Sequence, residues 1–212
     1  MLLLELKVSY NRNSVGASEL TRLATAARTE VWDKTLPFGT DSLRLLPEAY
    51  WERVSGILWE LEERFERVLD GAPGHLMHTI LPYPVLPEPG VPELHRQLAN
   101  DLQERELLAS YALMLRIKET LEHVVDRLAV DYVKGEAVLR RFHDSLFYNL
   151  SSENALYRAF NDDLFRDERL TTLCAGISTV VAHHPKLVRK DAGLRHSLRD
   201  ACKFLIDVVS KA

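Results

Sequence analysis

The chain has 212 residues, 46% of them apolar and 27% charged, and its formal net charge is −4. These values are ordinary for a folded globular protein and exclude a chain that is largely disordered. The modest net charge gives no reason to expect the whole molecule to bind nucleic acid or a membrane strongly. The longest apolar-dominated run, residues 107–115, is far below the roughly 20 residues that a membrane span needs.

Cysteine usage and the first residues bear on the location of the protein. Only two cysteines are present, Cys174 and Cys202, and both fall on apolar stripes of predicted helices. We therefore expect no disulfide framework and a reducing, cytoplasmic environment. The chain starts MLLLELKVSY, with no basic segment ahead of the apolar run and with Glu5 inside it, which argues against a signal peptide.

Residues 2–8 alternate between apolar and polar side chains, which is the pattern of a β-strand. A strand must pair its backbone groups with another segment, and residues 75–81 are the only other strand-like piece. The two segments predict a two-stranded ribbon, with a helix over residues 2–8 as the alternative.

Most of the remaining sequence has the spacing of amphipathic helices. Apolar residues recur three and four positions apart over residues 20–31, and this helix must end before Pro37. A second helix begins at Pro47, because proline suits a first helical turn, and it can close at Gly71. Between the two helices, Gly39 permits a turn with a positive φ.

A proline-rich segment, residues 71–92, follows the second helix. Its six prolines predict an extended connector, and a connector this long indicates that it is anchored or functional. The longest predicted helix, residues 93–134, ends at Gly135. Its middle, residues 107–117, is apolar on nearly every face, which indicates burial by its own bundle or by a second copy. A heptad seam can be drawn through Leu107, Tyr111, Met114, Lys118, Leu121, Val125, Leu128 and Tyr132.

Shorter helices complete the chain, over residues 136–150, around residues 156–160, over residues 170–181 and over residues 194–209, the last capped by Asp191. We therefore predict an all-α fold, a multi-helix bundle with one long central helix, to which the N-terminal ribbon would be a small addition. The 212 residues would form a single helical domain, with an N-terminal part (1–70), the proline-rich connector (71–92) and a C-terminal helical part (93–212).

The sequence lacks the motifs of the common enzyme classes. It has no glycine-rich phosphate loop, no H-E-x-x-H zinc motif and no G-x-S-x-G nucleophile motif. His75 and His78 could supply two metal ligands, but a third and a fourth are not evident, so polarity of a strand or loop is the better interpretation. We therefore expect a protein that is not an enzyme and that holds neither a cofactor nor a metal.

The C-terminal end is locally basic, with seven basic residues against three acidic ones in residues 185–212. The candidate nucleic-acid contacts are Lys186, Arg189, Lys190, Arg195, Arg199 and Lys203. Such a stripe could contact phosphates without sequence specificity. The more ordinary alternative is a solvated face that pairs with the acidic N-terminal half.

The segment ATAARTEVWDKTLPFGTDSLRLLPEAYWERV, residues 24–54, resembles a family of phage- and prophage-encoded proteins of unknown function. That family has a similar alanine-arginine helix and a "TLPW/F-G-x-D-x-x-RLLP" connector. The matching residues are Ala26, Ala27, Arg28, Thr35, Leu36, Pro37, Phe38, Gly39, Asp41, Arg44, Leu45, Leu46 and Pro47. RFHDSLFYNL (141–150) and HHPKLVRKDAGLRHSLRDA (183–201) are similar to two later segments of the family.

Members of that family are often encoded beside a MoxR-type AAA+ ATPase and a von Willebrand-A-type protein. The resemblance therefore implies a non-catalytic partner in a phage or host assembly, located in the bacterial host cytoplasm, with an AAA+ ATPase assembly as one candidate partner. A nucleic-acid-binding accessory protein is the alternative. We expect self-association, from residues 107–117, and no membrane partner. The candidate protein-interaction residues are Arg44, Tyr83, Val85, Leu86, Tyr111 and Met114.

Overall fold

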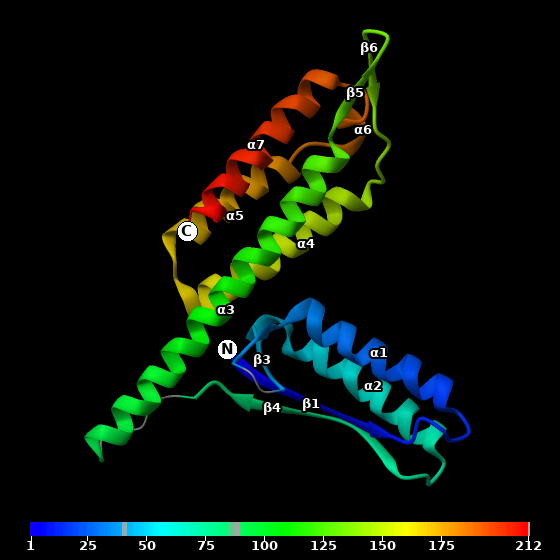
Figure 1. Cartoon of the computed structure of the whole chain (residues 1–212), viewed down its shortest axis with the longest axis vertical. Coiled ribbons are helices and arrows are strands. Elements are labelled where there is room, and N and C mark those ends of the chain that lie inside the picture. Colours follow the sequence, from blue (N-terminus) through cyan, green and yellow to red (C-terminus); the bar gives the residue numbers. More distant parts are fainter. Residues whose placement is uncertain (40–41, 85, 87–89, 212) are drawn as a thin grey trace. The chain divides into compact units, whose positions relative to one another are not determined.

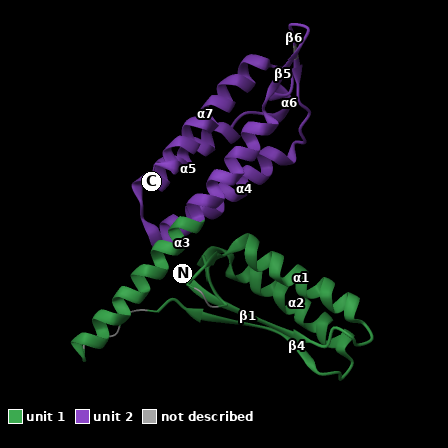
Figure 2. Ribbon diagram, in the orientation of Figure 1, with its two compact units in different colours: residues 1–112 green, residues 113–212 purple. Residues whose placement is uncertain are grey.

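The computed structural model describes residues 1–39, 42–84, 86 and 90–211. The chain divides into two compact units, unit 1 (Met1–Ala112) and unit 2 (Leu113–Ala212) (Figure 2). The boundary falls inside the long helix α3 (Pro92–Arg127), whereas the sequence places the division at the proline-rich segment 71–92. Each unit is described by itself.

Unit 1 contains an antiparallel sheet with the strand order β2-β3-β1-β4. Its strands are β1 (Leu2–Tyr10), β2 (Leu36–Pro37), β3 (Leu43–Leu46) and β4 (Gly74–Pro82) (Figure 1). The pairing of β1 with β4 runs from Leu2 opposite Pro82 to Tyr10 opposite Gly74. The predicted pairing of residues 2–8 with residues 75–81 is therefore confirmed, but two further strands extend the sheet on the other side of β1.

Helices α1 (Ala17–Lys34) and α2 (Trp51–Leu69) pack against this sheet, and the short 3-10 helix η1 (Glu48–Tyr50) leads into α2 (Figure 1). The core between the two layers is apolar. It includes Leu4, Leu76, Leu20, Leu23, Ala27, Val31, Val54, Leu58 and Phe65. Gly39 has a φ of 81°, as its place in the connector predicts.

The prediction of an all-α fold is wrong, because the described residues form a four-stranded and a two-stranded sheet beside the helices. The chain is mixed α/β. The connector between α1 and α2 supplies β2 and β3, which have only two and four residues, too few to show an alternating pattern. The first part of the proline-rich segment is extended and anchored, as predicted, since β4 pairs with β1 and runs through Pro82 at the edge of the sheet, where proline is tolerated.

Unit 2 contains the second half of α3, a β-hairpin and the remaining helices. These elements are β5 (Val130–Val133), β6 (Glu136–Leu139), α4 (Ser145–Phe160), the π-helical turn η2 (Asn161–Phe165), α5 (Glu168–Val181), α6 (Pro185–Val188) and α7 (Ala192–Ser210). The predicted helix over residues 93–134 ends at Arg127, because Lys134 (φ 52°) and Gly135 (φ 84°) form a two-residue hairpin turn. Positive φ at both central residues is the geometry that matches the twist of paired strands.

The core of unit 2 lies where α5 packs against α4 and α7. Its fully buried side chains include Tyr157, Phe160, Leu170, Ile177 and Cys202. The side chain of Asp191 accepts a hydrogen bond from the backbone N–H of Leu194 at 3.0 Å, which confirms the predicted cap of α7. Among the described residues, no helix combines the length and apolarity that crossing a membrane requires.

Candidate functional site

Arg44, a predicted interaction residue, is part of an internal contact of unit 1. Its Nε donates a hydrogen bond to Thr35 Oγ1 at 2.7 Å, and its guanidinium lies 4.1 Å from the centroid of the Trp32 ring. A cation over an indole face and a hydrogen bond together fix the side chain. Arg44 thus holds β3 against the end of α1, and it is not a free contact for a partner.

Tyr83 is likewise held inside unit 1. Its hydroxyl donates a hydrogen bond to a carboxylate oxygen of Glu106, and its ring meets Phe38 edge-on with a centroid distance of 5.7 Å. Burial, and then the hydrogen bond to Glu106, raise the pKa of Tyr83. Leu86 is half-buried, and Val85 lies outside the described residues. The segment after β4 is therefore anchored to α3 through Tyr83.

Four of the exposed apolar residues of α3 lie along one side of the helix and form a candidate docking surface, which we call the α3 strip: Leu107, Leu108, Tyr111 and Leu115. Their exposed fractions are 65%, 50%, 63% and 41%. The opposite face of the helix is buried through Ala109, Leu113 and Ile117, each 0% exposed. At 100° per residue the strip covers about 100° of the helix surface, the width that amphipathic helices normally bury.

The predicted heptad seam does not continue past the α3 strip. Leu121 and Leu128 are 0% exposed and belong to the core of unit 2, and Tyr132 lies on strand β5 beyond the end of the helix. Met114, another predicted interaction residue, is half-buried beside the strip. The seam members left at least partly exposed on the helix are therefore Leu107 and Tyr111, with Met114, Lys118 and Val125 half-buried.

The residues of the predicted basic stripe at the C-terminal end do not form one basic surface in the structure. Arg195 is 1% exposed and donates a hydrogen bond from Nε to the carbonyl of Val188 at 2.9 Å, so it cannot contact a phosphate on the surface. Arg189 pairs with Asp144 at 2.5 Å, and Lys203 lies 3.4 Å from Asp200.

The other three residues of the predicted basic stripe differ in their exposure to solvent. Lys186 and Lys190 are exposed, and Arg199 is half-buried. Arg195, Arg199 and Lys203 recur every four residues along α7, but the first is buried, the second half-buried and the third exposed. Helix α7 therefore carries no continuous basic face, and the geometry does not favour the nucleic-acid alternative.

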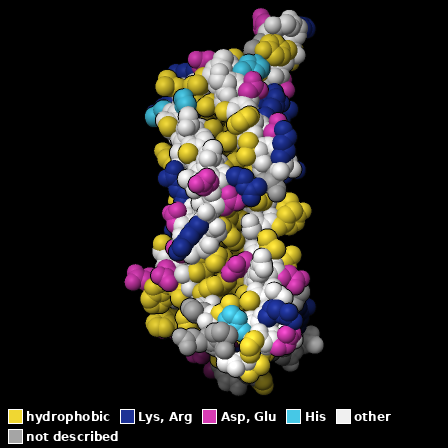
Figure 3. Space-filling view, turned by 90° about the vertical axis from the view of Figure 1, so that its left-hand side faces the viewer, with side chains coloured by type: hydrophobic (Ala, Val, Ile, Leu, Met, Phe, Trp, Pro, Cys, Tyr) yellow, Lys and Arg dark blue, Asp and Glu magenta, His cyan; other side chains and the backbone are white. Residues whose placement is uncertain are grey.

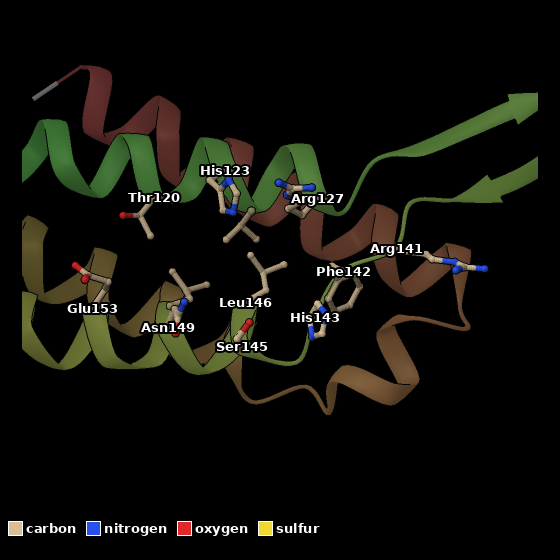
Figure 4. A pocket seen from close by; sticks show the side chains of 12 residues that line it. Thr120, His123, Arg127, Arg141, Phe142, His143, Ser145, Leu146, Asn149 and Glu153 are labelled. Carbon is tan, nitrogen blue, oxygen red and sulfur yellow. The ribbon is translucent and has the colours of Figure 1, made fainter.

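A cavity of about 330 Å³ lies in unit 2 between α3 and α4 (Figure 4). Its lining residues are Thr120, His123, Val124, Arg127, Arg141, Phe142, His143, Ser145, Leu146, Asn149, Leu150 and Glu153. Figure 4 shows Thr120 and His123 on α3 across from Asn149 and Glu153 on α4, with Arg141 at the end nearest the hairpin. Sequence reasoning missed this site, because its polar residues come from three segments that share no motif.

The electrostatics of this cavity are cationic. Of its twelve described lining residues, Glu153 is the one carboxylate, and it is neutralised by a two-pronged contact with Arg116 at 2.9 and 3.0 Å. Arg127 and Arg141 have no hydrogen-bond or ion-pair partner within the described part of the chain. The arrangement can bind an anion, and the lining contains no nucleophile paired with a base.

The predicted histidine pair of β4 has a structural role. Both the ring Nδ1 and the backbone N–H of His78 contact Glu62 Oε1, at 2.7 and 2.6 Å. This contact joins β4 to α2, while His75 is exposed. Over the residues that the structure describes, no three His, Cys, Asp or Glu side chains gather as a metal site requires.

The two cysteines are buried in unit 2, and burial raises the pKa of Cys174 to about 11 and that of Cys202 to about 12 from an ordinary value of 9.0. The thiolate is the reactive form. We expect a thiol reagent at pH 8 to leave the folded protein unmodified and to modify both cysteines once denaturant is added. Fast modification without denaturant would contradict the buried placement.

The same shifts predict alkaline destabilisation of unit 2. The pKa values of both thiols are higher in the folded protein than in the unfolded chain. The contribution of the two thiols to the free energy of unfolding is therefore complete below pH 9 and is lost as the pH rises through 11 and 12. Urea titrations followed by thiol exposure should show a midpoint that falls from pH 9 upward. A Cys202→Ser variant is the control, and its midpoint should fall less steeply.

A mixed α/β chain with an exposed apolar helix face and a cationic cavity defines no enzyme class by itself. Searches of protein-family models, of curated proteins and of solved structures find no match to this chain. The resemblance to the phage-encoded family therefore stays a prediction.

Proposed function

We propose that this protein is a non-catalytic interaction protein that works as a homodimer joined through the α3 strip. The observation that carries the proposal is the exposure of Leu107, Leu108, Tyr111 and Leu115 along one side of a single continuous helix. Figure 3 shows hydrophobic side chains at the surface in several places on the face that it draws. Apolar surface gathered on one helix face is more stable when a second surface covers it.

A second copy fits the α3 strip because the strip is self-complementary in an antiparallel arrangement. With Tyr111 on the two-fold axis, Leu107 of one copy lies opposite Leu115 of the other. Glu104 and Lys118 each stand seven residues from Tyr111, which is about two helical turns. Glu104 of one copy therefore faces Lys118 of the second copy, twice in each dimer, whereas a parallel arrangement would place like charges together.

The proposal of a further partner for this dimer is based on the sequence resemblance alone. We propose a component of a phage or host assembly in the bacterial cytoplasm, with an AAA+ ATPase assembly as the candidate. The absence of the common catalytic motifs from the sequence supports a role in binding.

Replacing Tyr111 with glutamate should weaken the dimer about 100-fold, because it places two like charges opposite each other in an apolar contact. Sedimentation equilibrium over a range of concentrations measures the change, against a monomer mass of 24.2 kDa. Tyr148→Glu is the matched control, since Tyr148 is also an exposed helical tyrosine, 69% exposed on α4. A wild-type chain that stays monomeric at high concentration would overturn the proposal.

Charge reversal tests the antiparallel register. Glu104→Lys and Lys118→Glu should each weaken the dimer, and the variant with both changes should recover it, because the opposite charges face each other again. Exposed ion pairs contribute about 0.2–1 kcal/mol each. Each single reversal changes both ion pairs of the dimer, so it should raise the dissociation constant roughly 10-fold. Failure of the double variant to recover would exclude this register.

A further inference from the structure

We propose that the cavity between α3 and α4 is a binding site for a small phosphomonoester that carries an apolar group. The argument uses contacts of unit 2 only and does not depend on the proposed dimer. It rests on the unpartnered arginines of the lining, on the pairing of the nearby carboxylates with other arginines, and on the apolar residues of the lining.

The carboxylates beside the cavity are paired with arginines that do not line it. Arg140 contacts Asp126 at 2.6 Å and Asp131 at 3.1 Å, and Arg189 contacts Asp144 at 2.5 Å. Arg127 and Arg141 therefore keep their charge available, although each is adjacent in sequence to one of these paired residues. Guanidinium groups bind phosphate oxygens with two parallel hydrogen bonds. Arg127 offers this contact at the cavity, while Figure 4 shows the guanidinium of Arg141 at the hairpin end, extended away from the other lining side chains.

A further positive charge lies behind the cavity wall. The guanidinium of the buried Arg195 is 5.0 Å from the centroid of the Phe142 ring, and Phe142 lines the cavity. Nη1 of Arg195 is buried and has no acceptor among the described residues. A buried charge is screened less by salt than an exposed one, so Arg195 makes the potential inside the cavity more positive.

The remaining lining sets the size and the kind of ligand. Phe142 and Leu150 are buried and Leu146 is half-buried, and together they form an apolar floor on the α4 side. His123 on α3 and Ser145 and Asn149 on α4 offer hydrogen-bonding groups beside these apolar residues (Figure 4). A volume of about 330 Å³ is at the small end for ligand pockets and suits a molecule no larger than a mononucleotide.

The first test is isothermal titration calorimetry of the full chain with three probes: adenosine monophosphate, adenosine and inorganic phosphate. We expect adenosine monophosphate to bind, adenosine to bind at least about 10-fold more weakly, and inorganic phosphate to bind more weakly than the monophosphate. No binding of the monophosphate at millimolar concentration overturns the proposal. If adenosine binds as tightly as the monophosphate, the proposed recognition of the phosphate is wrong. If inorganic phosphate binds as tightly, the proposed recognition of an apolar group is wrong.

The second test uses variants of the lining. Arg127→Ala should weaken binding of adenosine monophosphate at least about 10-fold, because one charge-assisted contact is lost. Asn149→Phe should weaken it by filling the cavity, and since Asn149 is exposed on α4, this variant tests the site without removing a charge. Arg53→Ala, at an exposed arginine of α2 in unit 1, is the matched control and should bind as the wild type does.

Far-ultraviolet circular dichroism establishes that the variants fold, and either cavity variant suffices for the test if the other does not fold. Wild-type affinity in both cavity variants would place the ligand elsewhere and overturn the proposal. Tyr111→Glu should keep wild-type affinity for the monophosphate even if it dissociates the dimer, so the failure of one proposal is distinguishable from the failure of the other.

Discussion

Phe65→Ala should lower the free energy of unfolding of unit 1 by about 3–5 kcal/mol, the range for removing a buried aromatic ring. Phe65 is 0% exposed and lies on α2 in the core between the helices and the sheet. Its ring meets Tyr10 of β1 edge-on, with a centroid distance of 5.6 Å. The substitution therefore removes apolar contacts, an aromatic pair and the filling of the space between the two layers.

This change can be measured for unit 1 alone, because all three tryptophans of the chain, Trp32, Trp51 and Trp59, lie in that unit. Urea unfolding followed by tryptophan fluorescence gives the free energy, and it should fall by a large part of the 5–15 kcal/mol, roughly, that proteins have in total.

Phe204→Ala is the matched control, since Phe204 is 68% exposed on α7 and its removal should change the tryptophan transition by less than about 0.5 kcal/mol. A Phe65→Ala variant as stable as this control would mean that α2 does not pack on the sheet as described.

The N-terminal strand could be predicted because its signal is local and repeated. Leu4 is buried, and Leu6 and Val8 pack against the same core, as the alternation of residues 2–8 requires. Strands β2 and β3 could not be found this way. They are too short to show a period, and their place in the sheet is fixed by pairing with β1, which is a contact between segments distant in sequence.

The hairpin of unit 2 was missed for a different reason. Val130, Tyr132 and Val138 fit a helical stripe about as well as a strand, and Gly135 was interpreted as the end of a helix. The deciding feature is the turn Lys134-Gly135, in which a lysine adopts a positive φ. Lysine is not one of the residues that mark such turns, so the local sequence gave no clear signal.

The candidate sites, like the strands, could be predicted only where the signal lies within one short segment of the sequence. The α3 strip lies inside the apolar stretch 107–117 that the sequence singles out, because periodicity along one helix is local. The cavity was not predicted, since Arg127 and Phe142 are brought together by the hairpin between them. Arg195 was placed on a basic face because its burial depends on the packing of α6 and α7, which a charge pattern does not contain.

Arg195→Ala should lower the free energy of unfolding of unit 2 by about 2–5 kcal/mol, the range for truncating a large buried side chain to alanine. The substitution leaves a cavity beside Phe142 and removes the hydrogen bond to the carbonyl of Val188. The extent of thiol modification of Cys174 and Cys202 in urea measures this change, because both cysteines lie in unit 2.

Arg195→Met should cost much less, under about 1.5 kcal/mol, because methionine has a similar length and fills the same space. Desolvation of the guanidinium lowers the pKa of Arg195, which shows that its charged form is disfavoured where it lies. Removing that charge while keeping the volume therefore offsets the lost hydrogen bond. If methionine costs as much as alanine, the charge itself stabilises the fold.

If methionine is well tolerated, the positive charge at position 195 does little for stability, and its presence behind Phe142 is better explained by the cavity. The Arg195→Met variant should then bind adenosine monophosphate more weakly than the wild type while unfolding at a similar urea concentration. The reason is that a buried charge 5.0 Å from the Phe142 ring acts on an anion in the cavity without touching it. Unchanged affinity would show that Arg127 and Arg141 alone make the cavity cationic.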